Sequence, residues 1–269
     1  FGVLADPGGR QPQAARVPCL GGAAVVAGVG GAGVPLAGLV GAGAAGMGFF
    51  AAAALAGVLG LVDDVRGLSP WTRLGFETAL AGALWAAGFG VEWVGDGLPG
   101  LVITVLWVVG VANAVNLLDN MDGLAPGVAA IAAAAFTALG LATGQVVVAV
   151  LGAALAGGTV GFLRTNAHPA RMYLGDTGSL FIGLLLAVLG ARLSVDGAPY
   201  LAALVLAVPI ADTLFVSMTR LARGISPLQG GTDHLSHRLV RLGLAVPAAV
   251  RVHYVVAAGC ALAAVVVAL

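Results

Sequence analysis

Lysine is absent from this chain, and charge of either sign is scarce. Only 9% of the 269 residues are charged, whereas 60% are hydrophobic. The mean hydropathy of +1.05 lies far outside the range of soluble domains. The apolar runs also lack the alternation of polar and apolar residues that marks membrane barrel strands. These features predict an all-α fold, a polytopic transmembrane helical bundle that forms one integral-membrane domain over residues 1–269.

Cysteine is scarce as well. Cys19 and Cys260 have neither a zinc-ligand spacing nor the density of a disulfide scaffold, so we interpret them as small apolar packing residues. An initiator Met is missing too: the chain starts at Phe1 and reaches Asp6 without a basic stretch before it. We therefore interpret the first five residues as the tail of a missing first helix rather than as a signal peptide.

Apolar runs between polar breaks predict about nine membrane spans, since a helix needs roughly 20 residues to cross the hydrocarbon core. The runs lie near residues 20–35, 44–62, 74–90, 99–117, 124–142, 145–163, 177–192, 199–219 and 247–268. If the N-terminal segment is cytoplasmic, strict alternation leaves only Arg192 on the opposite side of the membrane. The chain is thus expected to be a multi-pass protein of the plasma membrane.

Carboxylates stand at the ends of these apolar runs, all on the side predicted to be basic. An ionised group near hydrocarbon costs about 2.5 to 3.5 kcal/mol on insertion scales, so several together indicate a metal, a phosphate-bearing substrate or an ion path. The four clusters are Asp63-Asp64, Asp119 with Asp122, Asp176, and Asp212 followed by Asp233. They are therefore expected to form one site at the cytoplasmic face.

The first cluster places two acids side by side at the end of a predicted helix. Asp63 and Asp64 repel each other unless a divalent cation or a shared proton lies between them, and hard oxygen ligands suit Mg²⁺ or Mn²⁺. A solvated helix end with two interfacial charges is the alternative interpretation.

The second cluster combines amides with acids. If the chain is helical here, Asn113, Asn116 and Asn120 share one face, and Asp119 and Asp122 are three residues apart. This set suits a sugar, a ribose or a hydrated cation. A capped helix end with a turn after Asp122 is the alternative, but it leaves three amides within eight residues unexplained.

The third cluster lies at a predicted helix start. Backbone N–H groups there are expected to face an anion while Asp176 binds the anion's metal. A plain N-cap role for Asp176 is the alternative. His168, next to Pro169, is interpreted as a structural loop histidine.

The fourth cluster adds donors suited to phosphate oxygens. His234 and His237 are three residues apart and adjoin Arg238. The spacing also allows a transition-metal site, although the surrounding acids favour a hard ion. Asp212 lies inside a predicted span, so either it pairs with an arginine such as Arg220 or it acts in the site.

In order and spacing these segments resemble the polyprenyl-phosphate N-acetylhexosamine-1-phosphate transferase superfamily of membrane enzymes. The matching segments are Asp63-Asp64 with Gly67-Leu68, Asn113 to Gly123, Asn166 with Pro169-Ala170, Gly175 to Leu180, and His234 to His237. The loop from Asp233 to Leu239 looks like the branch that uses UDP-N-acetylglucosamine, because the muramoyl-pentapeptide branch has three consecutive histidines. The chain departs from the superfamily at Arg73, where Lys is common, and at Ser236, where His is usual.

The resemblance implies that the domain transfers N-acetylhexosamine 1-phosphate, specifically GlcNAc-1-phosphate, from a UDP-sugar to polyprenyl phosphate and releases UMP. This would be the first membrane step of cell-envelope glycan synthesis. Mg²⁺, or Mn²⁺ in its place, is the implied cofactor, with Asp176, Asp63 and Asp119 as metal ligands. The implied catalytic residues are Asp63, Asp64, Asp119, Asp122 and His234. The implied substrate-binding residues are Asn113, Asn116, Asn166, Arg220, His237 and Arg238. A route through an aspartyl-phosphate intermediate stays open.

The expected partners are the UDP-sugar, the polyprenyl phosphate lipid and the membrane, with a homodimer as a further expectation and no nucleic acid. The alternative functions are a UDP-MurNAc-pentapeptide phosphotransferase and, from another class, a membrane transporter. A transporter should hold its polar groups near mid-bilayer, whereas these gather at one face. An aromatic prenyltransferase should show a second acid-rich repeat, and the chain has none.

Overall fold

The computed structural model describes residues 4–5, 17–91, 93–95, 97–193 and 200–269. The opening segment, whose first five residues were interpreted as the end of a missing helix, lies mostly outside them. The helices run in this order: α1 (Gly21–Leu39), α2 (Gly43–Arg66), α3 (Pro70–Leu84), the π-helical turn η1 (Trp85–Phe89), α4 (Leu98–Leu118), α5 (Leu124–Ala142), α6 (Val146–Asn166), α7 (Gly175–Arg192), α8 (Tyr200–Val205), α9 (Ala207–Leu221), α10 (Leu235–Arg241) and α11 (Val246–Ala268). Two short antiparallel strands, β1 (Leu4–Ala5) and β2 (Val17–Pro18), precede them. The predicted all-α bundle is confirmed.

Seven helices of the described chain are long and apolar enough to cross a membrane: α1, α2, α4, α5, α6, α7 and α11. The count of nine spans is not confirmed, because two of the predicted spans are interrupted. The run near 74–90 is divided between α3 and η1, and Gly88 within η1 has a positive φ of 78°. The run near 199–219 breaks at Leu206. Pro209 has no backbone N–H to bond the carbonyl of Val205, four residues earlier, and its ring clashes with that carbonyl.

The first predicted span is longer than expected. The predicted run near 20–35 ends at Pro35, but α1 continues through this proline to Leu39. In an ideal helix the proline ring clashes with the carbonyl group four residues earlier. Where neighbouring helices support the chain, this clash bends a membrane helix rather than ending it. The turn to α2 comes instead at residues 40–42.

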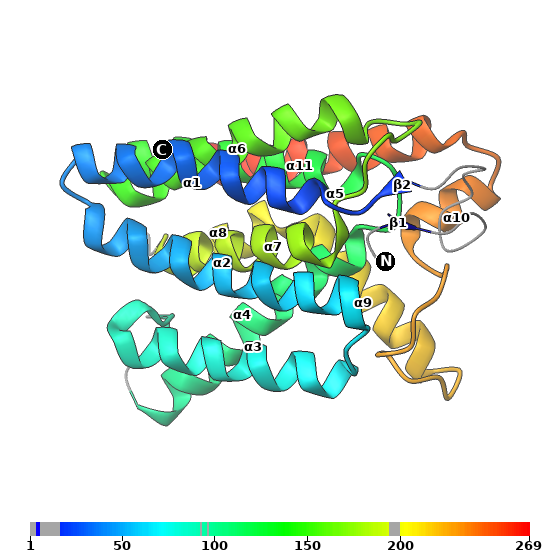
Figure 1. Cartoon of the computed structure of the whole chain (residues 1–269), viewed down its shortest axis with the longest axis horizontal. Helices are drawn as coiled ribbons and strands as arrows, with labels where there is room; N and C mark the ends of the chain where they lie inside the picture. The colour runs from blue at the N-terminus through cyan, green and yellow to red at the C-terminus, as the bar shows by residue number, and fades with distance from the viewer. Residues whose placement is uncertain (1–3, 6–16, 92, 96, 194–199) are drawn as a thin grey trace.

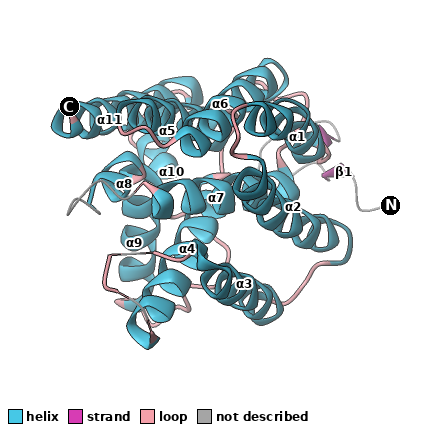
Figure 2. Ribbon diagram, turned by 90° about the vertical axis from the view of Figure 1, so that its left-hand side faces the viewer, coloured by secondary structure: helices cyan, strands magenta, loops and turns pink. Residues whose placement is uncertain are grey.

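Helix α7 forms the centre of the bundle, in contact with α1, α2, α4, α5 and α6 (Figure 2). All of its residues from Thr177 to Ala191 are buried. Small residues bring its neighbours very close: a Cβ atom on Gly60 of α2 would lie 2.2 Å from the carbonyl oxygen of Asp176. This approach places the end of α2 directly beside the start of α7.

The polar motifs collect at one end of the bundle. The last turns of α2, α4 and α9, the first turns of α3, α5 and α7, and the short helix α10 all lie at the right-hand end in Figure 1. The turn between α1 and α2 lies at the opposite end. Segments that are far apart in sequence thereby contribute side chains to one region.

Candidate active site

Asp64 closes the start of α7. Its Oδ1 atom accepts the backbone N–H of Asp176 at 2.8 Å, and its Oδ2 atom accepts the N–H and the hydroxyl of Thr177 at 3.0 and 2.7 Å. The sequence predicted that N–H groups at this helix start face an anion, and in the structure that anion is the carboxylate of α2 itself. Asp64 thus joins α2 to the positive end of the α7 dipole. Its catalytic role stays a prediction.

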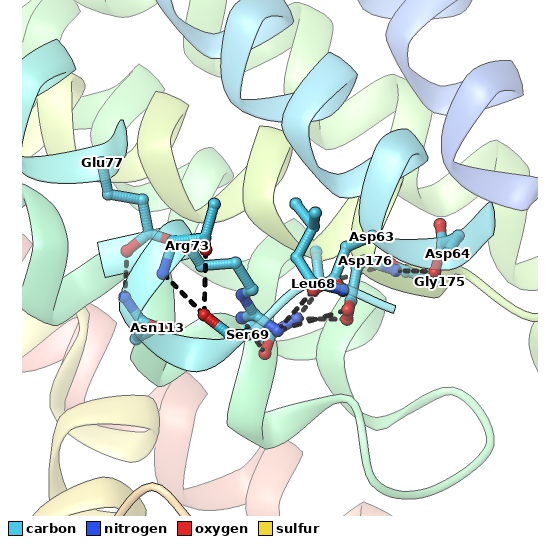
Figure 3. A network of polar contacts seen from close by, with 12 residues as sticks. Asp63, Asp64, Leu68, Ser69, Arg73, Glu77, Asn113, Gly175 and Asp176 are labelled. Carbon is cyan, nitrogen blue, oxygen red and sulfur yellow. Dashed lines mark hydrogen bonds and ion pairs between the residues drawn. The ribbon is translucent and has the colours of Figure 1, made fainter. Parts of the chain in front are cut away.

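Arg73 contacts the carboxylates of two helices (Figure 3). Its Nη1 atom donates to Asp63 Oδ2 at 2.9 Å and to Asp176 Oδ2 at 3.3 Å, and its Nη2 atom donates to Asn116 Oδ1 at 2.9 Å. Asn116 in turn donates to Asp176 Oδ1 at 2.7 Å and to Ser179 Oγ at 2.8 Å. Residues from α2, α3, α4 and α7 therefore meet around a single cationic group.

The same arrangement bears on the expected divalent ion. Asp63 and Asp176 each direct one oxygen atom at one cation, and Mg²⁺ commonly binds one or two protein carboxylates and completes its shell with water and substrate phosphates. Their charge and donor type therefore fit Mg²⁺. Among the residues that the structure describes, no group of three or more His, Cys, Asp or Glu side chains is arranged to hold a metal. Asp119 as a third ligand stays a prediction.

Asp119 follows the last turn of α4, and burial and the charges of the other acids raise the pKa of its carboxyl group. Burial, and after it the charges of Asp176 and Asp64, raise the pKa of Asp119 to about 8. Burial and the neighbouring acids thus favour the protonated form of this carboxyl group. The charges of Asp176 and Asp64 contribute to the shift, so Asp119 lies within electrostatic range of both acids.

Asp122 links two loops. Its Oδ2 atom accepts the backbone N–H of Ala170 at 3.0 Å and lies 2.9 Å from Nδ1 of His168. The segment between α4 and α5 is thereby held against the segment that leads into α7. The side chain of His168 contacts Asp122 rather than the acids around Arg73, in keeping with a loop histidine. The catalytic role predicted for Asp122 remains untested.

The two outlying asparagines also make defined contacts. Asn166, 2% exposed, accepts the N–H of Gly123 at 2.9 Å and donates to the carbonyl of Met172 at 2.9 Å. Asn113 donates to the Glu77 carboxylate and to the carbonyl of Val109. Asn166 therefore stabilises the loops around the site, and Asn113 lies one helical turn before Asn116. Substrate binding by either residue stays a prediction.

Asp212 pairs with a histidine. Its Oδ2 atom lies 2.7 Å from His234 Nδ1, and its Oδ1 atom accepts the N–H of Leu235 at 2.8 Å. The interpretation in which Asp212 pairs with Arg220 is wrong for this structure. The two residues are eight positions apart on α9, about 12 Å along the helix axis. Each bonds a nearer partner instead, Asp212 with His234 and Arg220 with Asp233.

Arg220 instead holds the loop between α9 and α10. It donates to both carboxylate oxygens of Asp233, at 2.8 and 2.6 Å, and to the carbonyls of Pro227 and Gln229. These bonds lower the pKa of Asp233 to about 2, so the pair stays ionised at neutral pH. Arg220 was predicted to bind substrate, and that prediction is untested. Its guanidinium group is already engaged within the loop.

Helix α10 carries the remaining predicted ligands to the same end of the bundle. Ser236 donates to Asn120 Oδ1 at 2.6 Å, which joins α10 to the loop after α4. The His237 ring lies 5.9 Å from that of His234, and burial lowers the pKa of His237. Arg238 stacks over Phe215 at 4.4 Å. The amide-rich and histidine-rich motifs are therefore neighbours in space.

Three residues of this region were not predicted as site residues: Glu77, Ser179 and, in its bridging role, Arg73. A signal for Glu77 was present, since it is a lone acid in an apolar run, the same criterion that marked the other carboxylates. Ser179 and Arg73 could be assigned only when their distant partners were known.

The residues around Arg73 also lie in the segment that is similar to known proteins. The model of glycosyl transferase family 4 matches residues 46–194, more than half of the chain. The chain belongs to glycosyl transferase family 4. This assignment confirms the superfamily resemblance seen in the four motifs. The matched segment contains most of α2 and all of α3 to α7, and thus every residue around Arg73, whereas Asp212, His234 and His237 lie beyond it.

Several relatives of this family 4 chain carry informative names. A probable undecaprenyl-phosphate N-acetylglucosaminyl 1-phosphate transferase of Bacillus subtilis is 34% identical over 74% of this chain and 59% of its own length. A putative glycosyltransferase of Streptomyces coelicolor is 43% identical over 98% of this chain and 62% of its own length. A decaprenyl-phosphate N-acetylglucosaminephosphotransferase of Mycolicibacterium smegmatis is 32% identical over 90% of this chain and 70% of its own length. The chain spans about six tenths of the first two relatives.

Proposed function

We propose that this chain transfers N-acetylglucosamine 1-phosphate from a UDP-sugar to polyprenyl phosphate. One observation carries the proposal: Asp63 of α2 and Asp176 of α7 converge on one cationic group at the polar end of a membrane bundle. Such a point suits the meeting of two anionic phosphates. The printed names of the Bacillus and Mycolicibacterium relatives supply the sugar and the lipid class.

In the reaction, an oxygen of the lipid phosphate attacks the phosphorus that carries the sugar, and the bond from this phosphorus to the oxygen of UMP breaks. Phosphoryl transfer of this kind depends mainly on alignment and charge neutralisation. A phosphate monoester already loses its second proton near pH 6, so a strong protein base is unnecessary. The products are UMP and a polyprenyl diphosphate sugar.

The protein residues supply positioning and positive charge. Asp63 and Asp176 would hold Mg²⁺, which neutralises charge on the diphosphate oxygens when bound. Arg73 adds a fixed cation at the same point, and Asp64 keeps the start of α7 aligned with the end of α2. Asn116 orients Asp176. Asp119, with its raised pKa, can take up or release a proton near neutral pH.

We place this site at the cytoplasmic face of the plasma membrane. Six of the exposed arginines lie near helix ends on the polar side of the bundle, as the positive-inside rule requires of a cytoplasmic surface. They are Arg66, Arg164, Arg171, Arg223, Arg241 and Arg251. A UDP-sugar is made in the cytosol and would reach the site directly from this side. Assembly as a homodimer belongs to the same proposal.

A UDP-MurNAc-pentapeptide phosphotransferase is the second candidate. A phospho-N-acetylmuramoyl-pentapeptide-transferase of Heliobacterium modesticaldum is 41% identical over 51% of this chain and 40% of its own length. The reaction at phosphorus is the same, so only the donor distinguishes the two. A transporter fits less well, because the acids lie at the end of the bundle rather than near its middle.

The deciding experiment incubates the purified protein with Mg²⁺, undecaprenyl phosphate and a panel of UDP-sugars that includes UDP-GlcNAc and UDP-MurNAc-pentapeptide. We expect UMP release with UDP-GlcNAc, loss of activity in EDTA and recovery with Mg²⁺ or Mn²⁺. Release with the muramoyl donor alone would favour the second candidate. No UMP from any donor would overturn the proposed function.

Asp176→Asn tests the centre of this site. The amide keeps the shape of Asp176 and one hydrogen bond with Asn116 but removes the charge that faces Arg73. We expect UMP release to fall by about 10²–10³-fold, the usual effect of removing one electrostatic contact to a transition state. Turnover is compared at equal amounts of detergent-purified protein with the same unfolding midpoint. Normal turnover in a well-folded variant would exclude Asp176 from the metal site.

A further inference from the structure

Asp212 and His234 form a pair that is almost completely enclosed. Asp212 is 1% exposed and His234 is 3% exposed. Asp212 comes from the second turn of α9, a helix that carries mostly apolar residues, and His234 precedes α10. A buried carboxylate is costly unless it is paired and hydrogen-bonded. Both oxygens of Asp212 satisfy this condition through His234 and Leu235.

The contact with Asp212 determines which ring nitrogen of His234 can bind a ligand. Since the carboxylate accepts hydrogen bonds, the Nδ1 atom at 2.7 Å must carry a proton. Nε2 is then the nitrogen that can meet a ligand, in the manner of carboxylate–histidine pairs whose second nitrogen binds a metal or a reacting group.

The second contact of Asp212 fixes the position of the ring. Its Oδ1 atom accepts the N–H of Leu235, the first residue of α10, where backbone N–H groups have no partner within their own helix. One carboxylate therefore holds both the imidazole and the start of the helix that follows. Ser236, bonded to Asn120, fastens the next residue to the loop that carries Asp119. His234 is thus held at the edge of the proposed site.

The surroundings contain other charged groups that would act on His234. The His237 ring lies 5.9 Å away and has a buried Nδ1 atom without a hydrogen-bond partner in the described part of the chain. Asp233 precedes His234 but is bonded through both oxygens to Arg220. Arg241 lies on the same side of α10 as His237. Asp212 is therefore the acid that contacts the His234 ring directly.

We propose that Asp212 is a positioning residue. It accepts a hydrogen bond from Nδ1–H of His234 and so turns Nε2 toward the diphosphate of the UDP-sugar, to which the ring donates from Nε2 when both nitrogens carry protons. This inference rests on the proposed function for the reaction, but the state of the ring can be measured without turnover. It adds to the site a residue outside the segment that matches the family.

The first test reads the His234 ring in the unaltered protein. The chain has four histidines, so ¹⁵N-histidine labelling gives few imidazole signals, and the His234→Gln variant identifies those of His234. We expect the Nδ1-protonated tautomer in the free protein. A ring protonated on Nε2 alone would overturn the proposal. This measurement stands even if no UDP-sugar releases UMP, so failure of the proposed function is distinguishable.

The second test uses Asp212→Asn. We expect the Nδ1-protonated signature of His234 to be lost and kcat to fall about 10- to 100-fold, the usual effect of removing a carboxylate behind a functional histidine. KM for the UDP-sugar should change much less, since Asp212→Asn leaves the other hydrogen-bond donors of the proposed site in place. In the double variant the loss should equal that of His234→Gln alone, because the two residues act as one unit. Additive losses, or unchanged kcat, would overturn the role.

Thr213→Val is the matched control. Thr213 is the neighbour of Asp212 on α9, and its buried hydroxyl has no hydrogen-bond partner in the described part of the chain. Valine has the same shape, so the His234 signals and kcat should both stay as in the unaltered protein. A loss of kcat in this variant equal to that of Asp212→Asn would show that the region is merely sensitive to change, and would overturn the assignment.

Discussion

Glu77 is the most enclosed acid near Arg73, with 1% of its surface exposed. It lies on α3 one helical turn after Arg73, and its carboxylate accepts a hydrogen bond from Asn113. Its other oxygen, Oε1, has no hydrogen-bond partner in the described part of the chain. Glu77 therefore holds the amide of Asn113 in place and lies within electrostatic range of Arg73.

Substitution of Glu77 separates the hydrogen bond from the charge. Glu77→Gln keeps an acceptor for Asn113, so its unfolding midpoint should stay near that of the unaltered protein. Glu77→Ala removes the acceptor and leaves a cavity, which should cost about 1–3 kcal/mol. Thermal unfolding in detergent at one scan rate checks both variants. Equal midpoints for Gln and Ala would show that the contact with Asn113 does not stabilise the fold.

For individual side chains, the sequence predicted the type of chemistry better than the residues that each side chain contacts. Acids at the ends of apolar runs predicted that Asp63 and Asp176 converge, and the structure brings them to one cation. The anion at the start of α7 was predicted as a ligand, whereas it is Asp64. A carboxylate accepts any nearby donor, so its partner depends on which helices pack together, and local sequence does not encode that.

Among the helices, the contact between α2 and α7 decides the geometry of the site. Gly60 lies one turn before Asp63, and its missing side chain lets the backbone of α7 come close. An added Cβ atom would lie 2.2 Å from the carbonyl oxygen of Asp176 and 2.6 Å from the backbone nitrogen of Thr177. Because both obstacles are backbone atoms, neither can rotate away.

Gly60→Ala should therefore separate the two helices. We expect a loss of about 1–3 kcal/mol in stability, as for other overpacked sites, and a larger loss of UMP release, because the bonds from Asp64 to the start of α7 would stretch. Gly75→Ala on α3 is the control, since nothing lies within 4 Å of its added Cβ atom. Both variants are compared by unfolding midpoint and UMP assay. Full activity in Gly60→Ala would mean that the contact is not required.

Element boundaries were predictable where polar residues mark them and not where prolines do. The end of α4 and the start of α5 fall at the amide-rich motif, close to the expected positions. Pro35 lies within α1, and Pro209 lies in the first turn of α9. A helix tolerates proline in its first turn and, where neighbouring helices support it, in its interior as well. Sequence alone therefore cannot decide whether a proline interrupts a span.

The molecule as a whole has two unlike ends. Six exposed arginines, the acid network and α10 lie at one end, and the turn between α1 and α2 lies at the other (Figure 1). The exposed Arg192, the last residue of α7, belongs to the second end. The sequence predicted this asymmetry from arginine placement alone, because the rule depends on loop composition and not on packing. The number of full spans could not be predicted in the same way, since α3 with η1 and α8 with α9 are interrupted helices.

Cysteine labelling tests the proposed orientation. Val40 follows α1 and Ser226 lies in the loop after α9; both are exposed. The turn after α1 and the loop after α9 lie at opposite ends of the bundle (Figure 1). In a chain whose Cys19 and Cys260 are replaced by Ala, we expect a membrane-impermeant maleimide to label Val40→Cys in intact cells. Ser226→Cys should react only in inverted vesicles or after permeabilisation, because arginines hold the polar end in the cytoplasm. The reverse pattern would place the acid network outside the cell, where no UDP-sugar is made, and would contradict the proposed reaction.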